Sequence, residues 1–401
     1  MGRQWGAGTA GGAGRWAPLL VALIFLVAMN LRAPITSVGP LLPQISADYG
    51  LSEPMAGLLG AMPLVAFALI SPLVHHASGR LGADRLLGLA LVLLAAGILV
   101  RSYGAAPGLW LGTIALGCAI AVGNVLVPVL IKRDYPGRIS VATGIFSACM
   151  GTVAAVAAAM AVPVSNASDW PTSLAIWAVP TALVALLWIL RLRRPAHAVD
   201  PVPTPTTPQV SVWTQPGAWL VTAFMGLQST CFYILITWLP TITTAAGYTP
   251  ERSGLHVFGL QMTGIVAGVL IPRLMRRPDS QVAAAVTASA PVIIGTLGLL
   301  IAPGLSGLWA LVVGAGTGAS LVVALSLISL RGRTQAETTQ LSGMAQSVGY
   351  LVASVGPVTA GLLAERTGGW QAPLLLLAAL ATAQTLVAIV AGKDRGMRSG
   401  T

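Results

Sequence analysis

The sequence predicts an all-α integral membrane protein with twelve transmembrane helices arranged as two parallel six-helix repeats. Three observations support this fold class: the apolar composition, a regular series of long apolar segments, and a repeat that relates the two halves of the chain. Of the 401 residues, 55% are hydrophobic and 8% are charged, and the mean hydropathy is +0.82. A soluble domain of this length needs far more charge on its surface. The composition therefore excludes a soluble protein, and with it nucleic-acid binding as the explanation of the net charge of +11.

Apolar segments of about 18 to 25 residues, each long enough to cross the hydrocarbon core, predict the helices. Twelve such segments occur, at 17–42, 54–76, 84–103, 108–131, 138–164, 172–191, 217–240, 253–275, 281–302, 306–330, 339–364 and 372–392. The first follows Arg3 and Arg15 as in a signal peptide, but it is too long for one and leads into further spans, so we interpret it as an uncleaved helix. Cys118, Cys149 and Cys231 lie inside apolar spans, which implies no disulfide framework.

The loops between these segments alternate in their content of Lys and Arg. Loops on one side carry 18 of the 22 basic residues, loops on the other side carry Arg101, Arg252 and Arg366, and Arg32 lies inside the first span. The positive-inside rule then places both termini in the cytoplasm and requires an even number of spans, which twelve satisfies. We therefore expect a multi-pass protein of the cytoplasmic membrane.

A segment rich in Pro and Thr, 193–215, divides the chain and indicates a cytoplasmic linker. It predicts an N-terminal six-helix bundle over 1–192 and a C-terminal six-helix bundle over 216–401. A constant offset of 197 relates Leu42-Pro43, Gly50, Ser52 and Gly57 to Leu239-Pro240, Gly247, Thr249 and Gly254. Chance matching of Gly, Leu and Pro does not readily explain the whole run from 42 to 58. Since six spans separate the copies, both halves have the same orientation, as in the major facilitator fold.

Arg32 is the residue around which we expect a functional site. It lies near the middle of the first span, where a charge costs roughly 2.5 kcal/mol or more on insertion scales. Pro34, Pro40 and Pro43 follow it and remove backbone donors, which is tolerated at that depth only beside protein or water. All eleven acidic residues lie in loops or at helix ends. The missing negative partner is therefore predicted to be a small anionic or electron-rich substrate, which a guanidinium holds bidentately. The alternative is a structural Arg32, bonded to helix carbonyls and to amides such as Asn124.

Other polar side chains lie near the middle of predicted spans, and they are Asn30, Asn124, Gln228, Gln261, Gln346 and Tyr350. Gln346 and Tyr350 are four residues apart and therefore share a helix face. Most of the set falls on helices that line or flank the cavity of the major facilitator arrangement, although an interhelical hydrogen bond explains any single amide equally well. No constellation of nucleophile, base and orienting residue is apparent, and no metal-ligand cluster, so we expect neither an enzyme nor a bound cofactor.

Four segments resemble the cyanate/nitroimidazole (CynX/NimT-like) transporters of the major facilitator superfamily. They begin at Asn30-Leu-Arg32, Gly123-Asn124, Phe224-Met-Gly-Leu-Gln228 and Leu341-Ser-Gly-Met-Ala-Gln346. The resemblance implies a monomeric secondary active transporter of the bacterial cytoplasmic (inner) membrane, moving a small anion such as cyanate, or a compact nitro-heterocycle, by alternating access. The substrate-binding residues that it implies are Asn30, Arg32, Asn124, Gln228, Gln346 and Tyr350.

The direction of transport and its coupling stay open. Uptake of an anion opposes an inside-negative potential by about 2.3 kcal/mol per charge per 100 mV. It therefore needs proton or cation symport, or exchange for an internal counter-anion, and the lack of a mid-membrane acid favours exchange or protons carried with the substrate. The alternative function is a drug/proton antiporter-type efflux pump for a neutral toxic compound, although such pumps usually have an intramembrane acid. A membrane enzyme or a receptor would need clustered catalytic side chains or a sizeable soluble domain, and the sequence has neither.

Overall fold

The computed structural model describes residues 17–135, 139–192, 211–276, 280–332 and 335–393, which are almost entirely helical. The helices of the first half are α1 (Ala17–Asn30), α2 (Ala33–Thr36), α3 (Val38–Tyr49), α4 (Glu53–Leu81), α5 (Ala83–Tyr103), α6 (Ala105–Asp134), α7 (Ile139–Ala167), α8 (Trp170–Ala175) and α9 (Ala178–Leu192). Those of the second half are η1 (Val212–Thr214), α10 (Pro216–Ala245), α11 (Pro250–Leu270), η2 (Ile271–Arg276), α12 (Val282–Ile301), η3 (Pro303–Leu305), α13 (Ser306–Arg331), α14 (Gln335–Thr367) and α15 (Gln371–Gly392).

The predicted number of spans is confirmed within these residues. Eleven spans are long and apolar enough to cross a membrane, and the bent pair Ala22–Thr36 and Val38–Tyr49 makes the twelfth when it is counted as one span. The continuous helix predicted over 17–42 is wrong, because the chain breaks between α1 and α2 and bends by 42° before α3. The helix predicted over 172–191 is likewise divided, into α8 and α9.

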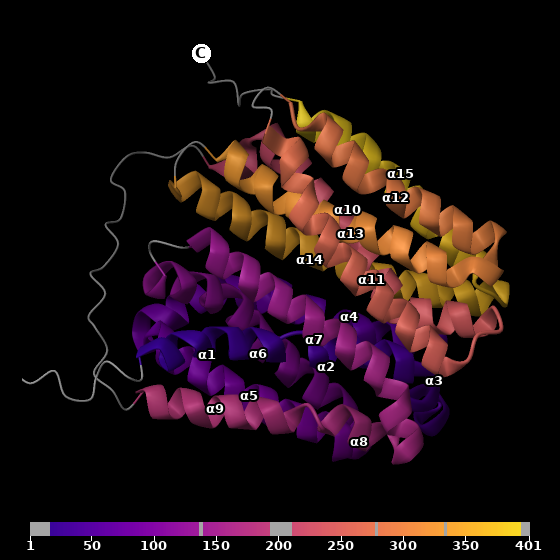
Figure 1. The fold of residues 1–401 in the computed structure, drawn as a ribbon, viewed down its shortest axis with the longest axis horizontal. Coiled ribbons are helices and arrows are strands. Elements are labelled where there is room, and N and C mark those ends of the chain that lie inside the picture. Colours follow the sequence, from indigo (N-terminus) through magenta and orange to yellow (C-terminus); the bar gives the residue numbers. More distant parts are fainter. Residues whose placement is uncertain (1–16, 136–138, 193–210, 277–279, 333–334, 394–401) are drawn as a thin grey trace, which may run out of the picture.

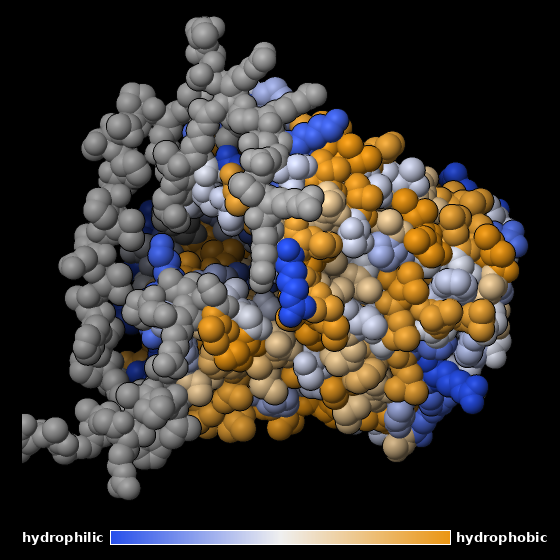
Figure 2. Space-filling model, turned by 45° about the horizontal axis from the view of Figure 1, so that its top comes forward, coloured by the Kyte–Doolittle hydropathy of each residue, from blue (hydrophilic) through white to orange (hydrophobic). Residues whose placement is uncertain are grey.

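Apolar side chains cover the outside of the molecule as well as its interior. Ile301, Val179 and Val269 are 78%, 71% and 69% exposed, and exposed Leu, Val and Ile side chains occur on nearly every long helix. Figure 2 shows them as broad apolar areas over the body of the molecule. Exposed apolar surface on this scale marks an interaction site or a membrane-facing surface. Together with the spans, it makes this a multi-pass membrane protein.

Figure 1 shows two groups of helices side by side, α1 to α9 in one and α10 to α15 in the other. Most of the predicted linker lies outside the described residues, and its last part carries η1 (Val212–Thr214). We keep the predicted bundle boundaries, 1–192 and 216–401, as a proposal, because 1–16, 193–210 and 394–401 lie outside the described residues too.

The repeat at an offset of 197 is present in the backbone. Gly50 and Gly247 both have a positive φ, of 62° and 94°, and each ends the first long segment of its half. Two residues later, Ser52 (φ −68°, ψ 162°) and Thr249 (φ −66°, ψ 153°) begin the next helix with the same extended conformation. Glycine adopts a positive φ without the steric cost of a Cβ. The matching glycines therefore mark equivalent turns in two copies of one unit.

The repeat also gives two close helix crossings between the halves, one at a glycine of the first half and one at the equivalent glycine of the second half. A Cβ at Gly57 on α4 would lie 2.4 Å from the carbonyl oxygen of Pro357 on α14. A Cβ at Gly254 on α11 would lie 2.9 Å from the carbonyl oxygen of Ala158 on α7. Since α4 and α7 belong to one half and α11 and α14 to the other, these two crossings join the halves.

The two ends of the molecule differ. We call the end where α9 finishes at Leu192 the linker end, and the opposite end, where α4 begins at Glu53, the distal end. Both glycine crossings lie toward the distal end, where the amide of Asn166 also donates to Glu251 across the halves at 2.7 Å. Toward the linker end, a Cβ at Gly144 on α7 or at Gly343 on α14 would meet none of the described residues of another element within 4 Å. Figure 2 shows the molecule hollowed on its left side.

Candidate functional site

The break in the first span positions Arg32. α1 ends at Asn30 and α2 begins at Ala33, with Arg32 as the residue before α2 (φ −118°, ψ −33°). Pro34 lies in the first turn of α2, where its missing N–H costs no helical hydrogen bond. In a continuous helix its ring would clash with the carbonyl of Asn30, four residues before it, which explains why the helix is interrupted after Asn30. The break turns the Arg32 side chain toward the second half.

Arg32 is half-buried against aromatic rings of α10. Its Nη1 donates to the hydroxyl of Tyr233 at 3.4 Å, and its guanidinium carbon lies 5.7 Å from the centroid of the Phe232 ring. Both contacts cross between the halves. The ion pairs found among the described residues are formed by other arginines. No carboxylate of the described chain lies within ion-pair distance of Arg32. Arg32 therefore carries a charge whose partners are a hydroxyl and a ring.

The rings form a cluster drawn from three helices, which we call the aromatic cluster: Phe67 on α4, Phe232 and Tyr233 on α10, and Tyr350 on α14. Ring centroids are 5.1 Å apart for Phe232 and Tyr233, 6.5 Å for Tyr233 and Tyr350, and 5.5 Å for Phe67 and Tyr350. All three pairs have edge-to-face geometry, which the ring quadrupoles favour. Because the cluster joins α4 to α10 and α14, it spans both halves of the molecule.

The cluster lies on the linker side of the distal closure. Phe67 follows Gly57 by ten residues along α4, which is about 15 Å at the helical rise of 1.5 Å per residue. Tyr350 precedes Pro357 by two turns along α14. The aromatic cluster, and Arg32 beside it, therefore lie on the linker side of the close contact between Gly57 and Pro357.

Of the predicted site residues, Arg32 and Tyr350 both lie next to Tyr233, and two of the amides have partners elsewhere. The side chain of Asn30 is 4% exposed; it donates to the Leu26 carbonyl at 2.8 Å and accepts from Thr181 on α9 at 2.9 Å. Gln228 is 2% exposed and donates to its neighbour Ser229 at 2.7 Å. Both amides therefore have partners within their own half.

The other two amides are less enclosed. Gln346 is half-buried and donates to Ser342, one turn before it on α14, at 2.9 Å. Asn124 is half-buried on α6. The polar partner of Arg32 is Tyr233 and not Asn124. All six residues stay predictions as ligand contacts.

Arg101 corrects the count of loop charges. The sequence pattern assigned it to a loop, but it lies in the last turn of α5 and its side chain is 1% exposed. Its Nη1 donates to the carbonyl of Pro34 at 2.5 Å. Arg32 is therefore not the only arginine withdrawn from water inside the first half.

An ionic cluster closes the linker end of the first half. Asp84 on α5 and Asp134 on α6 pair with Arg133 and with Arg191 on α9; Arg191 lies 2.6 Å from Asp134 and 3.3 Å from Asp84. The four side chains are 13% to 28% exposed. These ion pairs join α5, α6 and α9 within the first half.

Sequence reasoning missed Phe67, Phe232 and Tyr233, and it placed Arg101 wrongly. Aromatic side chains inside apolar helices are most often core, so composition gives no signal that Phe232 and Tyr233 contact a charge or that Phe67 joins their cluster. Tyr233 has the one usable feature, a hydroxyl in the middle of an otherwise apolar stretch of the seventh predicted helix.

Comparisons with known proteins agree with this architecture. A family model described as the Major Facilitator Superfamily matches residues 19–357. The chain is 37% identical over 382 residues to the 2-nitroimidazole transporter of Escherichia coli (strain K12), covering 95% of this chain and 97% of that protein. It is 30% identical over 358 residues to the cyanate transport protein CynX of the same organism, covering 88% and 91%.

A solved structure shows the same fold at low identity. The bacterial homologue of the human lysosomal transporter Spinster, in an inward-facing and unoccupied conformation, gives a TM-score of 0.77 at 15% identity, covering 97% of this chain and 100% of that chain. The relatives are transporters and not enzymes. The chain belongs to the Major Facilitator Superfamily and, within it, to the family of the cyanate and 2-nitroimidazole transporters.

Proposed function

We propose that the protein is a secondary active transporter that moves a small anion, or a compact planar heterocycle bearing a nitro group, by alternating access. Arg32 is the central positive charge of its substrate site. The observation that carries the proposal is the environment of this guanidinium, which is half-buried beside a hydroxyl and a ring with no carboxylate within ion-pair distance among the described residues. A charge withdrawn from water without a counter-charge is costly, and an anionic or electron-rich ligand offsets that cost.

The rings around Arg32 bear on the choice of substrate. Aromatic side chains pack against a flat ring with centroids about 4.5 to 7 Å apart, so the aromatic cluster suits a planar heterocycle. A nitro group presents two oxygens in one plane, as a carboxylate does, and the planar fork of an arginine fits that arrangement. One site can therefore accept a nitroimidazole-like ring or a short anion such as cyanate, the compounds after which the two relatives are named.

The difference between the two ends supports alternating access. The distal end is closed by the crossings at Gly57 and Gly254, whereas a Cβ at Gly144 or Gly343, toward the linker end, would meet no other element of the described chain within 4 Å. Transport then requires these distal contacts to separate while the halves approach each other at the linker end. We propose that the linker end and both termini face the cytoplasm of a bacterial inner membrane, because most of the Lys and Arg residues lie in the loops of that end.

The coupling follows from the position of the acids. All eleven Asp and Glu residues lie in loops or at helix ends, so no mid-membrane carboxylate is available to carry a coupling proton. We propose exchange for an internal counter-anion, or a proton that travels with the substrate. A single chain is the proposed working unit, since the site is built from helices of one chain.

A ligand screen by thermal unfolding tests the proposal. Purified wild type, Arg32→Gln and the control Arg252→Gln, an exposed distal arginine, are compared at constant ionic strength and constant chloride. The panel holds cyanate, bicarbonate, nitrate, short carboxylates and neutral nitro-heterocycles such as 2-nitroimidazole. A ligand at 100 times its Kd adds about 2.7 kcal/mol to the stability of the native state.

Stabilisation of wild type and Arg252→Gln by one of these compounds, absent in Arg32→Gln, is the expected result. Stabilisation by neutral compounds only, equal in all three proteins, would make Arg32 structural and favour efflux of a neutral toxic compound instead. Direct transport of the compound into proteoliposomes then distinguishes exchange from proton coupling, since exchange requires the counter-anion inside.

A further inference from the structure

Arg101 lies in the last turn of α5, at the distal end, but its side chain turns away from that end. An arginine in such a place normally extends its long side chain to the interface. Arg101 instead is 1% exposed, and its Nη1 donates to the carbonyl of Pro34 on α2 at 2.5 Å. A Cβ at Gly112 on α6 would lie 2.3 Å from the Arg101 backbone nitrogen. The packing of α5 on α6 therefore holds the backbone from which this side chain enters the first half.

The short helix α2 depends on side chains of its neighbours. A helix leaves its last four carbonyls without partners of its own, and α2 has only 4 residues. Arg101 bonds its Pro34 carbonyl from α5, and the Thr36 hydroxyl donates to the carbonyl of Ala154 on α7 at 2.9 Å. Because Arg32 is the residue immediately before α2, these two bonds fix the point from which the Arg32 side chain starts.

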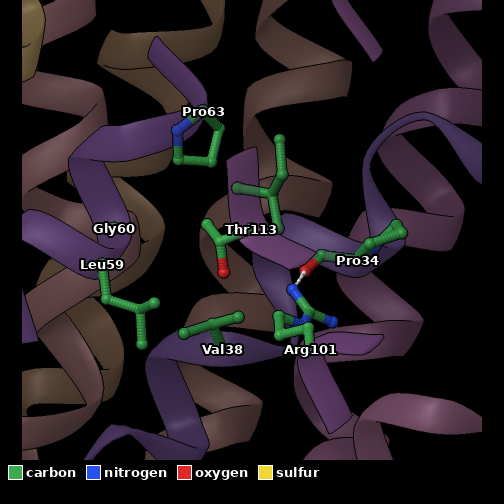
Figure 3. Close-up of a pocket in the computed structure, with 8 residues that line it drawn as sticks. Pro34, Val38, Leu59, Gly60, Pro63, Arg101 and Thr113 are labelled. Carbon is green, nitrogen blue, oxygen red and sulfur yellow. Dashed lines mark hydrogen bonds between the residues drawn. The ribbon is translucent and has the colours of Figure 1, made fainter. Parts of the chain in front are cut away.

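Two further donors of Arg101 have no partner in the described part of the protein. Nε and Nη2 are buried without a hydrogen bond, and a cavity of about 10 Å³ lies beside this side chain. Figure 3 shows the Thr113 hydroxyl directed into the space between Leu59, Val38 and Arg101. The lining comes from α2, α3, α4, α5 and α6: Pro34, Ile35, Val38, Leu59, Gly60, Pro63, Arg101 and Thr113.

One water molecule matches the size and the chemistry of this cavity. A space of about 10 to 15 Å³ is the least that holds a water. The Thr113 hydroxyl donates to the Leu109 carbonyl at 2.6 Å, and its oxygen retains the capacity to accept. The Pro34 carbonyl likewise has a second lone pair beside the one that Arg101 uses. These oxygens and the free donors of Arg101 supply the 2 to 4 polar partners that a buried water needs.

We propose that Arg101, together with one water in this cavity, is a positioning residue for Arg32. It fixes α2 within the first half, and α2 holds the backbone of Arg32 where the guanidinium reaches Tyr233 and Phe232 of the second half. A binding group is held accurately only when the residues that support it are locked by packing and hydrogen bonds. The inference rests on the proposed role of Arg32 in substrate binding and adds to it a residue that does not touch the substrate.

Binding of 2-nitroimidazole and of cyanate, measured by calorimetry, tests this role. Arg101→Met keeps the length of the side chain but removes every donor, so the Kd is expected to rise about tenfold, the factor for one lost hydrogen bond from a charged group. Arg101→Lys still has donors for the Pro34 carbonyl and is expected to recover most of the loss. Since removal of a buried charge changes the stability in either direction, the Kd is the readout and not Tm.

Ser173→Ala is the matched control. It removes a buried hydroxyl that donates to the Ala161 carbonyl at 2.7 Å elsewhere in the first half, and it should keep the wild-type Kd. An unchanged Kd in Arg101→Met, no recovery in Arg101→Lys, or an equal rise in Ser173→Ala overturns the proposal.

Structures of the unliganded protein provide a second measurement, which does not depend on the proposed substrates. Arg32 is expected to have left Tyr233 and Phe232 in Arg101→Met, and wild type is expected to hold a water between Arg101 and Thr113. An unmoved Arg32 in the variant, or no water in wild type, overturns the proposal. If Arg32 moves as expected but wild type binds neither probe, the positioning role stands and the substrate class proposed above is wrong. Thr113→Val, which removes the acceptor on α6, replaces Arg101→Met in both measurements if that variant does not fold, with a smaller rise in Kd expected.

Discussion

Gly57 is one of the positions at which the two halves approach most closely toward the distal end, and Gly57→Ala tests whether that closure opens during transport. A Cβ at this position would lie 2.4 Å from the carbonyl oxygen of Pro357, 2.8 Å from its carbonyl carbon and 3.0 Å from the Cα of Val358. These are backbone atoms of a long helix, so no rotamer change relieves the overlap. To restore an ordinary contact of 3.4 Å, α4 and α14 must separate by about 1 Å at this point.

The size of the effect follows from which state contains the contact. Overpacking of this kind costs about 1 to 3 kcal/mol. The state closed at the distal end bears the whole cost, because the halves are apart there in a distal-open state. Since about 1.4 kcal/mol corresponds to a factor of ten, the ratio of distal-open to distal-closed molecules rises about 5- to 140-fold.

Distance measurement between spin labels reads this ratio. Labels at Ser52→Cys and Thr367→Cys, both at the distal end and on opposite halves, are placed in a chain whose three native cysteines are replaced by alanine. Gly57→Ala is expected to add a population at longer distance. Gly79→Ala, on the same helix with no neighbour within 4 Å, is the matched control. An unchanged distribution in Gly57→Ala, or the same change in both variants, refutes the reasoning.

Three further substitutions have defined outcomes. Tyr350→Phe keeps the ring packing but removes the hydroxyl, so we expect the substrate Kd measured by calorimetry to rise severalfold; an unchanged Kd contradicts a role in binding. Gln384→Ala removes donors to two serines, at 3.0 and 2.9 Å, and should lower the free energy of unfolding by about 1 to 2 kcal/mol, whereas the neighbouring Thr385→Ala should change it little. Asp84→Asn weakens a partly exposed ionic cluster, so its loss of Tm should shrink in 1 M salt.

The fold was predictable because its signal is long and redundant. Each span needs about 20 apolar residues, and the predicted limits of most helices lie within a few residues of the observed ones, as for 84–103 against Ala83–Tyr103. The break at Arg32 was not predicted as a break. A proline is tolerated in the first turn of a helix. The sequence alone does not say whether the preceding helix continues through Pro34 with a kink or a new helix begins there.

The site was predictable only where a residue type is unusual for its surroundings. Arg32 stands out because charge is rare in a span. Tyr233 and Phe232 do not stand out, since an aromatic ring in an apolar helix is equally suited to the core, the lipid face or a cavity. The amides stay predictions: Asn30 and Gln228 bond to Thr181 and Ser229 within their own half, and such partners depend on helix rotation that periodicity does not define.

Arg101 lies in the last turn of α5, but it was counted among the loop charges. Counting it as a loop charge assumed that its side chain reaches water. The side chain of Tyr103, two residues later, does so and is 59% exposed, whereas that of Arg101 does not. Boundaries are the least certain part of sequence-based interpretation. The predicted end of this helix, at 103, nevertheless agrees with the observed one, so the error lay in the direction of the Arg101 side chain, which turns inward to the Pro34 carbonyl.

Arg101 and Arg32 both make contacts at the break in the first span, one within the first half and the other across to the second half. Arg101 bonds the Pro34 carbonyl within the first half, whereas Arg32 reaches Tyr233 and Phe232 in the second half. If the halves rock against each other as proposed, the Arg101 contact moves as part of one body and the Arg32 contact lies between two bodies. Spectroscopic distances should therefore show a constant separation of α5 from α2 and a state-dependent separation of α2 from α10. A rigid α2–α10 distance during turnover would mean that substrate release does not require Arg32 to leave its partners.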